Sequence, residues 1–138
     1  MSYDDQNIFT KILRGEIPNV TVYEDDNVLA FMDVMPHADG HCLVIPKEPA
    51  IGIYDISQDA LSASILITQK LAKACKAAFN ADGITIRQHN EPAGGQEVFH
   101  LHFHVVPRYD GIALKPAASK MEDMDVLIKN AEKIKAAL

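Results

Sequence analysis

Five short stretches of the chain have the length and composition of β-strands, at residues 21–24, 28–33, 41–47, 83–90 and 99–107. A period of two places successive side chains on opposite faces of an extended backbone, and polar and apolar residues alternate strictly at residues 100–105. Asp25-Asp26-Asn27 forms a turn between the first two stretches. In the second stretch Leu29 and Phe31 share one face, while Ala30 and Met32 share the other. The pattern therefore predicts a sheet of five strands.

Three other segments have helical spacing. A short helix is expected over residues 7–13, with Gly15 as its stop. Ser57 caps a long helix whose apolar stripe belongs to the core or to a subunit interface. Ser119 and Glu122 match a capping box, which predicts a last helix over about 119–137 that covers the sheet or reaches a partner. The two stripes are Leu61, Ile65, Thr68, Ala72, Cys75 and Phe79, and then Met124, Leu127, Ala131, Ile134 and Leu138.

The last of the five strands carries three of the chain's six histidines, His100, His102 and His104. Neighbouring histidines lie roughly 7 Å apart on one face of such a strand. The opposite face carries Leu101, Phe103 and Val105 and must pack on a core, so the histidine face is expected to look into a cleft or solvent. Imidazole is donor, acceptor or nucleophile near neutral pH, which makes these residues candidates for catalysis.

Two other interpretations of the histidines stand beside catalysis. The row of His100, His102 and His104, here called the histidine ladder, can be merely structural, although packing does not readily explain three histidines on one face. It can also supply metal ligands, as alternating histidines on a strand do elsewhere. Against the metal site, no further ligand group is evident nearby in the sequence.

The segment before the histidines indicates phosphate binding. The Gly94-Gly95 pair allows close backbone approach to an anion, and Asn90 and Gln96 supply polar amides. At this point the sequence resembles the histidine triad (HIT) superfamily, whose signature is His-x-His-x-His followed by two apolar residues. Matching blocks occur in order along most of the chain, at residues 8–12, 15–18, 23–26, 29–33, 40–47 and 90–108.

The resemblance implies an α+β fold, in which a mostly antiparallel five-stranded sheet carries one long helix, a short N-terminal helix and an extra C-terminal helix. The whole chain, residues 1–138, would be one HIT domain with its core at about 6–112. It also implies a homodimer and a purine nucleotide or nucleotidyl compound as ligand. The expected chemistry is hydrolysis or transfer at the α-phosphate through a nucleotidyl-histidine, in the manner of a nucleoside phosphoramidase.

Roles are carried over from the family by position in this sequence. His102 is the expected nucleophile, His104 and backbone N–H groups near Gly95 and Gln96 hold phosphate oxygens, and His100 orients the nucleophile. Asn90 and Gln96 match the phosphate-side amides, and Asp33 matches an aspartate that accepts from the ribose hydroxyls. The expected walls of the base pocket are Ile8, Phe9, Ile12 and Phe31.

The chain departs from the family pattern at several positions. Asn7 and Thr10 stand where zinc-binding relatives have cysteines, and Pro49 stands where many have histidine, so no structural zinc and no cofactor are expected. Glu97 replaces a serine usual in phosphoramidases, while Pro107-Arg108 is frequent in dinucleoside polyphosphate hydrolases. His104 argues against the transferase branch, which has glutamine there. A dinucleoside polyphosphate hydrolase and a non-catalytic nucleotide sensor therefore remain alternatives.

Composition adds constraints on partners and compartment. A net charge of −6 argues against general binding to nucleic acid or anionic membranes. Cys42 and Cys75, without a Cys-x-x-Cys pattern, predict neither a disulfide framework nor a zinc ribbon. The acidic first residues do not resemble a signal peptide, and no apolar run approaches membrane-spanning length. A cytoplasmic protein is expected.

Overall fold

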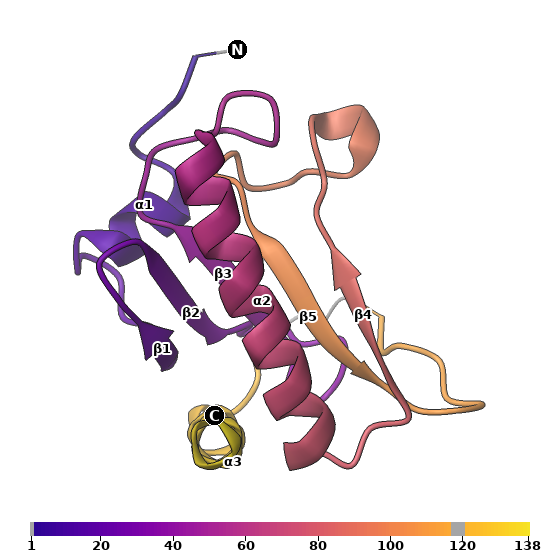
Figure 1. Ribbon diagram of the computed structural model, residues 1–138. Helices are drawn as coiled ribbons and strands as arrows, with labels where there is room; N and C mark the ends of the chain where they lie inside the picture. Colours follow the sequence, from indigo (N-terminus) through magenta and orange to yellow (C-terminus); the bar gives the residue numbers. More distant parts are fainter. Residues whose placement is uncertain (1, 117–120) are drawn as a thin grey trace.

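The computed structural model describes residues 2–116 and 121–138 (Figure 1). Its five strands form one antiparallel sheet in the order β1-β2-β3-β5-β4. The fold therefore confirms the expected α+β class. The strands are β1 (Thr21–Glu24), β2 (Val28–Met32), β3 (Cys42–Pro46), β4 (Gly83–Arg87) and β5 (Phe103–Arg108), and the helices are α1 (Ile8–Leu13), α2 (Gln58–Ala78), α3 (Met124–Ala137) and the short 3-10 turn η1 (Pro92–Gly94).

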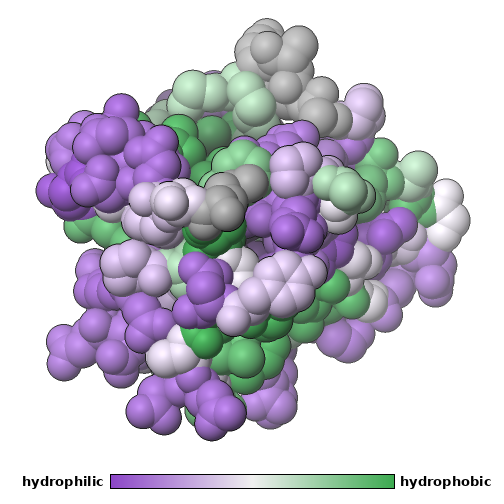
Figure 2. All heavy atoms as spheres, turned by 90° about the horizontal axis from the view of Figure 1, so that it is seen from above, coloured by the Kyte–Doolittle hydropathy of each residue, from purple (hydrophilic) through white to green (hydrophobic). Residues whose placement is uncertain are grey.

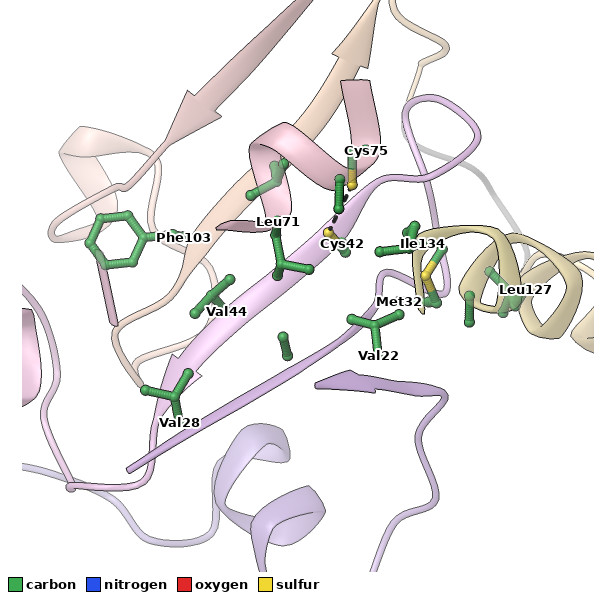
Figure 3. Close-up of a cluster of buried hydrophobic side chains, with 14 of the residues drawn as sticks. Val22, Val28, Met32, Cys42, Val44, Leu71, Cys75, Phe103, Leu127 and Ile134 are labelled. Atoms are coloured by element: carbon green, nitrogen blue, oxygen red, sulfur yellow. Dashed lines mark hydrogen bonds between the residues drawn. The ribbon is translucent and has the colours of Figure 1, made fainter. Parts of the chain in front are cut away.

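Helices cover both faces of the sheet, and this explains why every residue of β2 and β3 is buried. On one face α2 crosses the strands and α3 lies beside it (Figure 1). Side chains from α2, α3 and the strands meet there in a single core (Figure 3). The other face packs against α1 through Phe9 and Ile12. The predicted division of β2 is confirmed, because Leu29 and Phe31 face α1 whereas Ala30 and Met32 face α2.

The long helix begins where the sequence predicted, with the Ser57 hydroxyl accepting the Ala60 N–H at 3.1 Å. Most of the predicted stripe is confirmed, because Thr68 and Cys75 are buried and Leu61, Ala72 and Phe79 pack against the core. Ser64 and Leu71 lie against the sheet, whereas Ile65 is 43% exposed. The Ser64 hydroxyl donates to the carbonyl of Ala60 within the helix, so a polar residue is buried there without an unpaired group.

The last helix packs on its own sheet, which decides between the two expected arrangements. Leu127, Ala131 and Ile134 join the core beneath α2 and β1 (Figure 3). The helix begins at Met124, later than predicted, because Asp123 caps it by accepting the Asp125 N–H. Ser119 of the predicted capping box lies outside the described residues.

The two strands nearest the histidines are shorter than predicted. β4 ends at Arg87 instead of residue 90, where the amides of Gln88 and Asn90 bond to each other. β5 begins at Phe103 instead of residue 99, because the N–H of Leu101 donates to the carbonyl of Ala50 in a loop. Consequently His104 is the one member of the histidine ladder that lies within a regular strand.

Several apolar side chains remain exposed on α2 and on the edge strand β4. Leu66 is 62% exposed and Ile86 is 46% exposed. Such residues suit the expected homodimer, which stays a prediction that a sedimentation mass of two chains would test. The surface seen from above mixes hydrophilic and hydrophobic side chains (Figure 2). Among the described helices, none combines the length and hydropathy needed to cross a bilayer.

Candidate functional site

The three histidines lie together on the sheet face that carries α1. The rings of His102 and His104 are 5.1 Å apart, and the Phe9 ring meets His102 edge-on at 4.9 Å. His100 is fully buried and His102 is 7% exposed, so the expectation that this face opens into a cleft or solvent is wrong for both residues. Helix α1 covers them, and His104 is the most accessible of the three.

The hydrogen bonds of His102 determine which ring nitrogen is free. Its Nδ1 lies 2.7 Å from the backbone carbonyl of His100, and a carbonyl can only accept. Nδ1 therefore carries the proton, and the lone pair of the neutral ring is on Nε2. Burial lowers the pKa of His102 to about 4, so the ring stays neutral at physiological pH. His102 has the protonation state that a nucleophile requires.

His100 is held at both ring nitrogens. Its Nε2 donates to the carbonyl of Pro46 at 2.8 Å, so its Nδ1 must accept, and the Tyr3 hydroxyl donates to it at 2.6 Å. The same hydroxyl bonds to the side chains of Asn7 and Thr10. Tyr3 was not anticipated from the sequence, because nothing local to the tyrosine indicates a contact with a residue 97 positions away.

This cluster also bears on the zinc site of some relatives. Asn7 and Thr10, which stand at the expected cysteine positions, bond to each other and to Tyr3. An amide and a hydroxyl are poor zinc ligands, since structural zinc is held by thiolate and imidazole. The side chains that surround His100 therefore do not fit a zinc ion.

A second unpredicted residue, His41, orients His104. The Nδ1 of His41 accepts the backbone N–H of His37 at 3.1 Å, so its Nε2 carries the proton and donates to His104 Nδ1 at 2.9 Å. The remaining nitrogen of His104, Nε2, must then be a donor. Burial lowers the pKa of His41 to about 3 and of His104 to about 2, which keeps both rings neutral. Sequence reasoning placed His41 at the start of a strand but not beside the ladder.

Asp33 completes this group. Its Oδ1 accepts the Met35 N–H at 2.8 Å and its Oδ2 lies 3.4 Å from His41 Nε2. Burial raises the pKa of the Asp33 carboxyl. Among the described residues, one group of three side chains has the geometry of potential metal ligands, namely Asp33, His41 and His104. The local sequence does not indicate this group, because its members are far apart along the chain. The proton on His41 Nε2 occupies the lone pair that a metal would need, so the arrangement favours the hydrogen bond from His41 to His104 over a metal site.

An apolar wall lies beside the histidines. Phe9 contacts Phe31 at 5.6 Å between ring centroids, and Ile12 belongs to the same buried cluster. The fold thus brings three of the four expected base-pocket residues together. Ile8 is 47% exposed and is not part of that cluster.

The glycine loop differs from the expectation in its hydrogen bonds. The N–H groups of Gly95 and Gln96 donate to carbonyls of the loop itself, at Pro92 and Glu91. The Gln96 side chain bonds to the backbones of Ile51, Val98 and Glu91, and the side-chain oxygen Oδ1 of Asn90 accepts the Ile53 N–H. These groups therefore shape the loop and are not free donors, contrary to the sequence-based assignment. In the described part of the chain, the N–H groups of Glu97 and Val98 donate to no backbone carbonyl.

The order and setting of these residues agree with comparisons to known proteins. The family model described as the HIT domain matches residues 14–111, most of the chain. The chain belongs to the HIT family. A HIT-like protein of Bartonella henselae, described as involved in cell-cycle regulation, has a crystal structure with a TM-score of 0.95, 51% identity and full coverage of both chains.

Two curated HIT relatives extend the comparison. An uncharacterized HIT-like protein of Methanocaldococcus jannaschii is 41% identical over 124 residues, covering 88% of this chain and 95% of that protein. The adenosine 5′-monophosphoramidase of Saccharomyces cerevisiae is 39% identical over 103 residues, covering 75% of this chain and 63% of the yeast protein.

Proposed function

We propose that the protein binds a purine nucleotidyl compound and hydrolyses it at the α-phosphate through a covalent nucleotidyl-histidine on His102. The single observation that carries this proposal is the state of His102, whose Nδ1–H bonds to the His100 carbonyl and leaves a lone pair on Nε2. Membership of the HIT family supports a nucleotide as ligand, and the yeast relative is an adenosine 5′-monophosphoramidase.

The reaction has two displacements. The lone pair of His102 Nε2 attacks the α-phosphorus, and the bond to the leaving group breaks with its electron pair going to that group. An amine departs after taking a proton from water, whereas a phosphate departs as an anion. Water then attacks the phosphorus and loses a proton to solvent, and the phosphorus–nitrogen electron pair returns to His102.

Other residues stabilise the charge that develops. The cationic ring of the intermediate keeps its Nδ1–H bond to the His100 carbonyl, which favours positive charge. The Nε2–H of His104, set by His41, donates to a non-bridging oxygen of the phosphate. The N–H groups of Glu97 and Val98 replace those of Gly95 and Gln96 as the backbone donors.

The remaining contacts bind the nucleoside. Phe9, Phe31 and Ile12 offer the flat apolar wall that a purine requires, and Ile8 contributes at its edge. Asp33 accepts from the ribose hydroxyls, since its Oδ2 makes no bond shorter than the 3.4 Å approach to His41. Solvent reaches 17% of the Asp33 side chain, enough for a ligand to contact the carboxylate.

Turnover in chelator-treated buffer tests this function. We expect hydrolysis of adenosine 5′-phosphoramidate or of a dinucleoside polyphosphate to continue after dialysis against a strong chelator, because no step needs a metal. Loss of turnover that zinc restores would instead favour a metal hydrolase at Asp33, His41 and His104. Tight nucleotide binding without turnover of either compound would favour a sensor.

Replacing Asp33 separates binding from chemistry. In Asp33→Asn we expect KM to rise about tenfold while kcat changes less than about threefold, because a ribose contact is equal in ground and transition states. Asp39→Asn is the matched control, since Asp39 is an exposed aspartate in the following loop. Steady-state kinetics give both constants. A normal KM with a collapsed kcat would contradict the assigned role.

A further inference from the structure

Two basic side chains that the proposed mechanism does not use lie beside His104. Arg87 ends β4 directly opposite His104 on β5. Because paired residues of antiparallel strands project from the same face, the two side chains are neighbours. The ring of His89, two residues further, lies 5.9 Å from the ring of His104. Both therefore flank His104 on its β4 side, opposite to the Asp33–His41 side.

Both side chains have buried polar atoms without a partner. Among the described residues, Arg87 Nε and His89 Nδ1 are hidden from solvent yet make no hydrogen bond. Buried polar groups are nearly always paired, so such atoms call for a ligand or another explanation. The glycine loop closes over the same place, since a Cβ on Gly95 would lie 2.5 Å from His89 Nδ1. The ring of His89 therefore lies between the glycine loop and the ring of His104.

Arg87 also supplies a positive charge that the histidines lack. Burial keeps His41, His102 and His104 neutral at physiological pH. The positive charge of Arg87 contributes to the lowered pKa of both His41 and His104, which places the guanidinium within electrostatic reach of the site. An arginine remains charged at every relevant pH. The guanidinium of Arg87 would therefore neutralise the negative charge of phosphates attached to the α-phosphate.

We propose that Arg87 and His89 form a subsite for an anionic leaving group, a phosphate or polyphosphate chain joined to the α-phosphate. This inference rests on the proposed function and selects nucleoside polyphosphates over phosphoramidates as the preferred substrate class. The chemistry differs between the two. When the bond to phosphorus breaks, a phosphate keeps the electron pair as a stable anion and needs a nearby cation. An amine needs a proton and gains nothing from a guanidinium.

Two substrates with one nucleoside test the subsite. Adenosine 5′-phosphoramidate releases an amine, and diadenosine triphosphate releases ADP, while both leave the same adenylyl group on His102. For Arg87→Gln we expect kcat/KM on diadenosine triphosphate to fall at least about tenfold, because the variant loses a charge-assisted contact with the leaving group. On the phosphoramidate it should fall less than about threefold. Arg87→Lys should keep part of the activity on the triphosphate.

Arg108→Gln is the matched control. Arg108 lies opposite Gly83 at the far end of β5, and its Nη1 donates to Thr85 at 3.2 Å. The variant removes the same charge, also from an arginine whose Nε is buried and unpaired. Its ratio of the two kcat/KM values should equal that of the wild type, and thermal melts should show all three variants folded.

Two results would overturn the subsite. One is an equal loss on both substrates in Arg87→Gln, which would assign Arg87 to the α-phosphate or to the fold. The other is no loss on the triphosphate. Either result leaves the proposed function intact as long as the wild type forms the adenylyl-histidine. If the wild type forms no adduct from either compound, the proposed function itself fails.

Discussion

His102→Ala is expected to abolish the covalent step and to lower kcat by about a thousandfold or more. The variant removes the ring whose Nδ1–H is fixed by the His100 carbonyl and whose Nε2 is left with its lone pair. Nucleotide binding should survive, because the apolar wall, Asp33 and the loop donors lie on other residues. Rapid quench with a labelled nucleotidyl substrate, followed by peptide mapping, measures both the adduct and its position.

The adduct has chemical properties that identify it. A phosphorus–nitrogen bond to histidine is acid-labile and comparatively stable to base. His37→Ala serves as the control, because the His37 side chain bonds to the carbonyl of Lys115 and the hydrogen bond of His37 to His41 runs through a backbone N–H that alanine retains. An adduct on His100, His104 or His89, or near-normal turnover in His102→Ala, would show that the mechanism is wrong.

The value of kcat is expected to fall to half of its maximum near pH 4. Attack requires the neutral ring, so activity is complete above the pKa of His102 and is lost as the pH falls through it. Burial lowers that pKa to about 4. An ordinary imidazole with a pKa of about 6.5 would lose about 97% of its neutral form by pH 5, whereas His102 should keep most of it.

The measurement is kcat at saturating nucleotide between pH 3.5 and 8 in steps of about half a unit, a range chosen from the lowered and ordinary pKa of histidine. Circular dichroism must accompany it. Histidines that are buried and neutral when folded take up protons on unfolding below about pH 6.5, so stability also declines with acid. An acid limb of kcat centred near pH 6.5 in folded protein would contradict the assignment of His102 as a buried, neutral nucleophile.

The sequence predicted the sheet well because periodicity is a local property. Leu101, Phe103 and Val105 lie in the core beneath α2, as a period of two required. The histidine ladder was correctly placed on the opposite face. Its burial could not be predicted, because α1 and Tyr3 cover it from a distant part of the chain.

Other errors have equally physical causes. The predicted stripe of α2 was wrong at Ile65, because a helix face is broad and a hydroxyl that bonds back to the helix allows Ser64 to lie against the sheet instead. His41 went unassigned because it meets His104 across 63 residues, through neighbouring strands. The glycine pair predicts free backbone donors, yet carbonyls of the same loop accept the N–H groups of Gly95 and Gln96.

The contact between Tyr3 and His100 has a practical consequence for anyone who prepares this protein. The ring that supports the nucleophile is held by a hydroxyl in the segment that precedes α1. A proteolytic cut between Tyr3 and Asn7 would remove that hydroxyl without touching the sheet, α2 or α3. A cleaved sample would then melt normally and react slowly, so specific activities should be compared only between preparations whose mass shows that Tyr3 is present.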